Sequence, residues 1–121
     1  MLPQNIKSNS RYSLGKKERL NDTRVINQVR KLGVSLKAFP LKITALENSE
    51  GFARLVLVFT KRSGNSVVRN RVKRLSREFF RTHKNELRVA DYLVFGMGNL
   101  EKLYRQMWDK IALKWLEWAK R

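Results

Sequence analysis

The segment from Val67 to Arg81 reads VVRNRVKRLSREFFR, and it interleaves cationic and apolar residues with the period of an α-helix. At about 100° per residue, its apolar side chains fall on one narrow arc of a helical wheel: Val68, Val72, Leu75 and Phe79. Such a stripe is stable when it packs against another apolar layer. The spacing therefore predicts a helix from about Ser66 to His83 that lies on a sheet or on other helices.

The opposite side of this predicted helix carries almost only cations. The polar residues there cover a broad arc of the helical wheel and are Arg69, Asn70, Lys73, Arg74, Arg77 and Arg81. Arg71 lies apart from them, beyond the other flank of the apolar stripe. Glu78 is the only acid between residues 66 and 85. Like charges four residues apart cost roughly a few tenths of a kcal/mol per pair, so a helix selected for stability alone would mix charges. The pattern favours a surface that binds phosphates over an ordinary solvated face.

The residues just upstream extend this basic surface. The segment KRSGNS adds Lys61 and Arg62, and Gly64 allows the backbone to turn tightly before the helix. Asn65 or Ser66 can cap the helix, whose first N–H groups are free to meet an anion. We therefore add Lys61, Arg62 and Asn65 to the residues predicted to bind phosphates.

The charge balance points to a polyanionic partner. The 121 residues fit one domain, and 27 basic against 10 acidic residues give a formal charge of +17. That excess repels itself unless a polyanion offsets it, and nucleic acid is a better candidate than an anionic membrane. No stretch approaches the ~20 apolar residues of a membrane span. The absence of cysteine excludes disulfides and a cysteine nucleophile, and it fits a cytoplasmic location.

The remaining patterns predict a single α/β domain over residues 14–121, preceded by a flexible basic arm at 1–13. A short helix is expected within residues 20–33, capped by Asp22 or Asn21. Strands are expected at 40–46, 53–60 and 91–98, with the second in a central position. A last helix is expected at 99–121, with Asn99 as its cap and Trp108 and Trp115 in its core stripe.

The sequence offers no constellation for catalysis. His83 is the only histidine, and its place at a predicted helix end favours a surface or capping group over a general base. The acids are scattered without the close pair that hydrolases use. No spacing of His, Asp and Glu suggests a metal site. We expect no catalytic and no metal-binding residue in the protein.

The signature segment KRSGNSVVRNRVKRLSREFFR closely resembles that of the protein component of bacterial ribonuclease P. The residues that carry the resemblance are Gly64, Asn65, Arg69, Asn70, Arg71, Lys73, Arg74, Arg77 and Glu78. The surroundings agree over about residues 14 to 116, from the LGKKERL entry to the DYLVFG strand and a closing helix. The match is long and specific.

The resemblance implies a fold and a function. The fold would be an α/β (α+β) two-layer sandwich, with a small mixed sheet, the order αβββαβα and a likeness to a ribosomal S5 domain. The function would be that of an RNA-binding subunit of an endoribonuclease, a hydrolase that removes the 5′ leader from precursor tRNA. Its partners would be the catalytic RNA subunit and precursor tRNA, with Mg²⁺ bound mainly by RNA and no other protein required.

The resemblance also implies a cleft between the first helix and the sheet that takes the single-stranded leader. Aromatic residues usually line it, and the corresponding positions here hold Ile26, Arg30 and Thr44. An arginine could replace a ring by a phosphate contact or by stacking its planar guanidinium on a base. These three residues are the predicted leader site.

Two alternatives remain open at this point. A ribosomal or structural RNA-binding protein would explain the charge and the fold class but not the full signature. A DNA-binding module would use residues 66–83 as a recognition helix, yet that helix is crowded with arginine and poor in residues that read bases. One experiment separates the ribonuclease P interpretation from these alternatives. If the protein is added to ribonuclease P RNA at low Mg²⁺ and leader cleavage is restored, the ribonuclease P interpretation stands.

Overall fold

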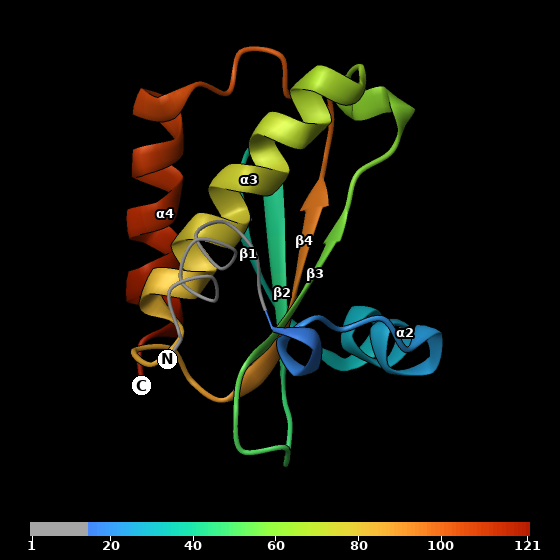
Figure 1. Cartoon of the computed structure of the whole chain (residues 1–121), viewed down its shortest axis with the longest axis vertical. Helices are drawn as coiled ribbons and strands as arrows, with labels where there is room; N and C mark the ends of the chain where they lie inside the picture. Colours follow the sequence, from blue (N-terminus) through green and yellow to red (C-terminus); the bar gives the residue numbers. More distant parts are fainter. Residues whose placement is uncertain (1–14) are drawn as a thin grey trace, which may run out of the picture.

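In the computed structural model, which describes residues 15–121, four strands form one mixed sheet with helices packed on it (Figure 1). The elements in chain order are η1 (Lys16–Glu18), α2 (Thr23–Leu32), β1 (Val34–Ala38), β2 (Leu41–Glu47), β3 (Arg54–Val58), η2 (Lys61–Ser63), α3 (Ser66–His83), β4 (Ala90–Gly96) and α4 (Arg105–Ala119). The expected order αβββαβα is confirmed. The arm predicted at residues 1–13 lies outside the described residues.

The sheet has the order β1-β2-β4-β3, so the last strand in the sequence occupies an inner position. β2 pairs antiparallel with β1 and β4, whereas β3 pairs parallel with β4 and is joined to it by α3. The prediction that residues 53–60 form a central strand is therefore wrong. The apolar run of β3 reflects contact with apolar residues on both faces of the sheet. At the outer edge of β3, the N–H of Leu20 donates a hydrogen bond to the carbonyl of Leu55 at 2.9 Å.

The two faces of the sheet hold two apolar clusters because successive strand residues point to opposite sides. The main cluster joins the sheet to α3 and α4 and includes Ile43, Tyr92 and Val94. The smaller one joins Leu93 to Val29 of α2 and to Leu20. The sheet with α3 and α4 thus makes the expected two layers, and α2 covers part of the opposite face.

Helix α3 spans the predicted residues and buries the predicted stripe. Its apolar side chains at the core are Val68, Val72, Leu75, Phe79 and Phe80, and all are buried. Asn65 caps it, since its side-chain oxygen accepts a hydrogen bond from the N–H of Val68 at 3.0 Å. Gly64 has φ of 127°, a backbone conformation that glycine adopts at low cost.

Helix α4 begins six residues later than predicted. Asn99 accepts a hydrogen bond from the N–H of Glu101 in a turn, whereas Tyr104 precedes the helix without a side-chain cap. The reason is packing, because Leu100 and Leu103 of the connecting loop are buried in the main core. None of the described helices has the length and apolarity that crossing a bilayer requires.

A buried ion pair ties β3 to β4. Arg54 donates two hydrogen bonds to the Asp91 carboxylate, at 2.7 and 2.9 Å, and Asn48 donates a third at 2.7 Å. Asp91 is only 2% exposed. The hydrogen bond to Asp91 raises the pKa of Arg54, and burial opposes that shift. The hydrogen bond between Asn48 and Asp91 also holds the β2–β3 turn, because the Asn48 side chain donates a second hydrogen bond to the carbonyl of Phe52.

Candidate RNA interface

The basic side chains of α3 leave the helix in three directions. Lys73 and Arg77 are half-buried and point toward the outer edge of β3, where they line a pocket. Asn70 and Arg74 lie on the exposed arc away from the core. Arg71 turns instead toward the loop that precedes α4. Arg71 thus lies apart, as its place on the helical wheel predicted, and the rest of the cationic face divides between the edge of β3 and the exposed arc.

The residues upstream of α3 extend its basic surface. Lys61 and Arg62 are exposed in the short helix η2, whose start is capped by the Thr60 hydroxyl. Half-buried Arg69 lies on the first turn of α3, and its Nε donates to the carbonyl of Asn65 at 3.5 Å. Four of the predicted RNA-binding residues thus gather at the N-terminal end of α3.

Two other predicted RNA-binding residues of α3, Arg74 and Arg81, differ in their exposure to solvent. Arg74 is exposed and has an interaction within the protein. Arg81 is half-buried on the last turns of the helix. His83 meets Glu86 at 3.1 Å, as expected for a surface or capping group. RNA contact at these positions stays a prediction.

Arg71 acts as an internal clamp. Its Nη2 donates to the carbonyls of Glu101 and Leu100, at 2.6 and 3.3 Å. Its guanidinium also lies over the ring of Tyr104, 4.4 Å from the centroid. These contacts hold the β4–α4 loop against α3. The signature arginine at this position therefore has a structural role, and its RNA contact stays a prediction.

We expect Arg71→Ala to lower the free energy of unfolding by about 2 kcal/mol, the scale of a charged group losing its hydrogen bonds. Arg71→Lys should restore little, because an ammonium cannot both stack on Tyr104 and reach two carbonyls. Urea denaturation measures both values. Unchanged stability of Arg71→Ala would contradict the clamp. A smaller salt dependence of RNA binding in the folded variant would show that Arg71 also contacts RNA.

The predicted leader residues lie on or near the sheet face that α2 partly covers. Ile26 is half-buried in the smaller cluster, and Arg30 is exposed on α2. Thr44 is 4% exposed, and its hydroxyl is hydrogen-bonded to that of Ser35 at 2.9 Å. The structure therefore leaves Arg30 accessible and Thr44 enclosed.

A residue that the sequence analysis did not select lies on the same face. Phe95 of β4 is half-buried in the smaller cluster, next to Val58 of β3. It also borders a pocket of about 410 Å³ that Arg62 and Thr60 help to line. The alternation of side chains along β4 predicts that Phe95 and Val94 point to opposite faces of the sheet. That β3 lies next to β4 was not predictable from spacing.

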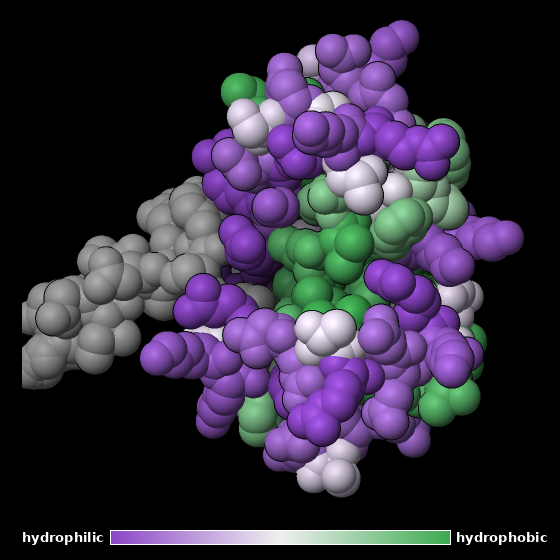
Figure 2. All heavy atoms as spheres, turned by 90° about the vertical axis from the view of Figure 1, so that its right-hand side faces the viewer, coloured by the Kyte–Doolittle hydropathy of each residue, from purple (hydrophilic) through white to green (hydrophobic). Residues whose placement is uncertain are grey.

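The space-filling view from this side shows a hollow with hydrophobic atoms at its floor and hydrophilic atoms around its rim (Figure 2). The side chains of the smaller cluster that are only partly buried are Val25, Ile26, Leu46, Val56, Val58 and Phe95. An apolar floor with a hydrophilic rim suits single-stranded RNA, which presents flat bases and a charged backbone.

The fold and these surfaces define the chain as a small basic α/β protein that binds RNA. The family model for ribonuclease P matches residues 14–118, and the chain belongs to that family, the ribonuclease P protein components. The match covers the signature segment and every described helix and strand except the last residue of α4.

Relatives and solved structures agree with this assignment. The ribonuclease P protein component of Syntrophus aciditrophicus is 35% identical over 94 residues, which cover 77% of this chain and 79% of that protein. The RNase P protein from Thermotoga maritima has a TM-score of 0.71 and 28% identity, over 86% of this chain and 96% of that one. The RNase P protein of Staphylococcus aureus has a TM-score of 0.69 and 25% identity, over 83% and 92%.

The family membership settles the main functional prediction. The chain is the RNA-binding subunit of ribonuclease P, with a role in an endoribonuclease complex and the ribonuclease P RNA as partner. The ribosomal and DNA-binding alternatives find no support. The individual contact residues stay predictions.

Proposed function

We propose that the protein assists a catalytic RNA in removing the 5′ leader from precursor tRNA in the cytoplasm, and that the RNA carries the chemistry. The observation behind this proposal is the adjacency of two surfaces. The cationic side of α3 and the apolar hollow beside α2 share the edge strand β3. One surface suits a folded RNA backbone and the other a single strand.

The role of the cations is to let two RNAs approach. Lysine and arginine that replace condensed counterions lower the repulsion between phosphate backbones. Among residues 15–121 no three His, Cys, Asp or Glu side chains form a group that could hold a metal ion. In this proposal Mg²⁺ is an ion held mainly by RNA. The protein favours its binding there by drawing the two backbones together.

The proposed leader site is the hollow beside α2. A base stacks on Phe95, with Arg62 on the neighbouring phosphate, and Arg30 lies at the rim on α2. The ring of Phe95 then serves where the family usually has aromatic residues at the positions of Ile26, Arg30 and Thr44. The half-buried ring and its shared pocket with Arg62 support this placement.

Reconstitution tests the function. The purified protein should restore cleavage of precursor tRNA by a bacterial ribonuclease P RNA at low Mg²⁺, and RNA-free protein should cleave nothing. Product ends mapped to the mature 5′ position identify leader removal. Failure to stimulate cleavage by an RNA of a related bacterium, with RNA binding intact, would reject the assisting role.

The leader site has its own test in the assembled enzyme. We expect Phe95→Ala to weaken binding of precursor tRNA by about 1–3 kcal/mol, the scale of one base stack, while binding of mature tRNA is almost unchanged. Phe95→Tyr, which keeps the ring, is the matched control. An equal loss for both RNAs would place Phe95 outside the leader site, and a loss for neither would remove it from RNA binding.

A further inference from the structure

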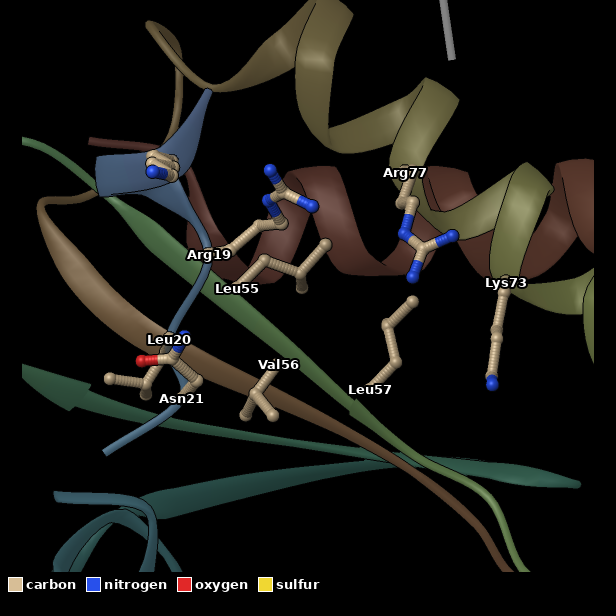
Figure 3. Close-up of a pocket in the computed structure, with 9 residues that line it drawn as sticks. Arg19, Leu20, Asn21, Leu55, Val56, Leu57, Lys73 and Arg77 are labelled. Atoms are coloured by element: carbon tan, nitrogen blue, oxygen red, sulfur yellow. The ribbon is translucent and has the colours of Figure 1, made fainter. Parts of the chain in front are cut away.

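A pocket of about 400 Å³ lies where the η1 segment and α3 approach each other over the outer edge of β3 (Figure 3). We call it the edge pocket. Among the residues that line it are Lys16, Arg19, Leu55, Leu57, Lys73 and Arg77. In Figure 3, Arg19 and Arg77 reach into the same space from its two sides, with the leucines of β3 below. Residues almost sixty positions apart in the sequence thus share one cavity.

The edge pocket concentrates unbalanced positive charge. It is lined by four cations and by no acid. Within residues 15–121, none of these four side chains takes part in an ion pair. Arginine stays charged at any ordinary pH, so the repulsion among these groups persists until an anion enters. The pocket therefore suits a phosphate.

The segment that carries Arg19 is held in place before any ligand binds. On one side Glu18 pairs with Lys84 at the end of α3 and accepts the N–H of Gly15. On the other side Leu20 is buried and bonded to the Leu55 carbonyl. A cation between two fixed residues loses little freedom on binding, and this lowers the entropic cost of association.

The position of the pocket favours a single strand of RNA as its ligand. Leu55 and Leu57 belong to the face under α3, whereas Val56 belongs to the face under α2, so the pocket wraps around the edge of the sheet. A single strand that runs from the hollow to the cationic side of α3 crosses this edge. The apolar floor suits a ribose or base beside the phosphate.

We infer that the edge pocket binds one phosphodiester of single-stranded RNA, with its sugar or base against Leu57 and its charge shared by Arg19 and Arg77. The inference rests on the proposed function and adds Lys16 and Arg19, which lie outside the signature segment. The strand belongs either to the leader of precursor tRNA or to a joining segment of the catalytic RNA, and both present the same chemistry.

The first experiment compares two double variants of the full-length protein with equal net charge. Lys16→Ala/Arg19→Ala should weaken binding of a single-stranded RNA oligonucleotide about tenfold and lower the slope of log K against log salt by about 0.7. Lys110→Ala/Lys114→Ala removes two exposed lysines of α4 and should change neither. Equal losses in the two variants would mean that only total charge matters, and would overturn the inference.

A double-mutant cycle tests whether one phosphate is shared. If Arg19 and Arg77 hold the same group, Arg77→Ala should cost less in the Arg19→Ala background than alone. Losses that multiply within about twofold would place the two arginines on separate phosphates and overturn the shared site. Urea denaturation of each variant confirms that the fold is intact.

The assembled enzyme distinguishes the two sources. A loss for precursor but not mature tRNA assigns the phosphate to the leader, and a loss of affinity for the ribonuclease P RNA assigns it to the catalytic RNA. A holoenzyme that cleaves precursor tRNA normally, with neither affinity changed by Lys16→Ala/Arg19→Ala, would overturn the edge pocket but leave the proposed function standing. No cleavage by the wild-type holoenzyme would reject the function itself.

Discussion

Replacing Arg69, Lys73 and Arg77 together by alanine should strongly reduce RNA affinity and its dependence on salt. For every phosphate that is no longer neutralised, the slope of log K against log salt should flatten by about 0.7–0.9, so the slope of the triple variant should fall by up to about 2–3. All three side chains are half-buried on α3, and Lys73 and Arg77 also line the pocket at the edge of β3. Affinities for ribonuclease P RNA at several salt concentrations provide the measurement.

The control for this variant removes the same charge elsewhere. Lys110, Lys114 and Lys120 are exposed on or just after α4, and their replacement by alanine also lowers the net charge by three. This control should keep most of the slope. Should the α3 variant retain the wild-type slope while folded, its side chains are merely solvated, and the RNA binds another surface.

Asp91→Ala should lower the free energy of unfolding by about 3–5 kcal/mol, a large share of the total for a domain of this size. The substitution leaves Arg54 without the carboxylate that accepts its two hydrogen bonds, in a site where Asp91 is almost fully buried. It also frees Asn48, which holds the turn between β2 and β3. Urea denaturation followed by circular dichroism measures the loss.

A paired substitution separates the ion pair from its surroundings. Replacing both partners, as Arg54→Met/Asp91→Leu, should be less damaging than Asp91→Ala, because no charge is left buried alone. A loss below about 1 kcal/mol for Asp91→Ala would mean that the pair behaves like an exposed one. In that case the β3–β4 junction depends on apolar packing instead.

Helix α3 was predictable in full because its evidence is local. The period of Val68, Val72, Leu75 and Phe79 lies within four turns, and Asn65 sits next to the helix it caps. The start of α4 was not predictable from local sequence, because the burial of Leu100 and Leu103 outweighs the capping preference of Asn99. Strand β1, which the spacing did not indicate, depends on pairing with β2 and not on a pattern of its own.

The site was predictable by residue type but not by direction. The sequence showed that α3 is cationic, yet Arg71 makes its hydrogen bonds about thirty residues further along the chain. The edge pocket joins two segments that no spacing rule connects. The same limit explains why residues 53–60 were predicted as a central strand, since an apolar run reports burial on two faces and says nothing about neighbours.

The sheet order also determines when the RNA surface can exist during synthesis. A chain is made from its N-terminus, and β4, the last strand, is the one that lies between β2 and β3. Before residues 90–96 emerge, only β1 and β2 can pair, and a lone two-stranded hairpin is marginally stable at best. The nascent α3 therefore leaves the ribosome with its cations and its apolar stripe but with no sheet to lie on. A polypeptide that stops short of Ala90 carries every signature residue and still cannot present them as a surface.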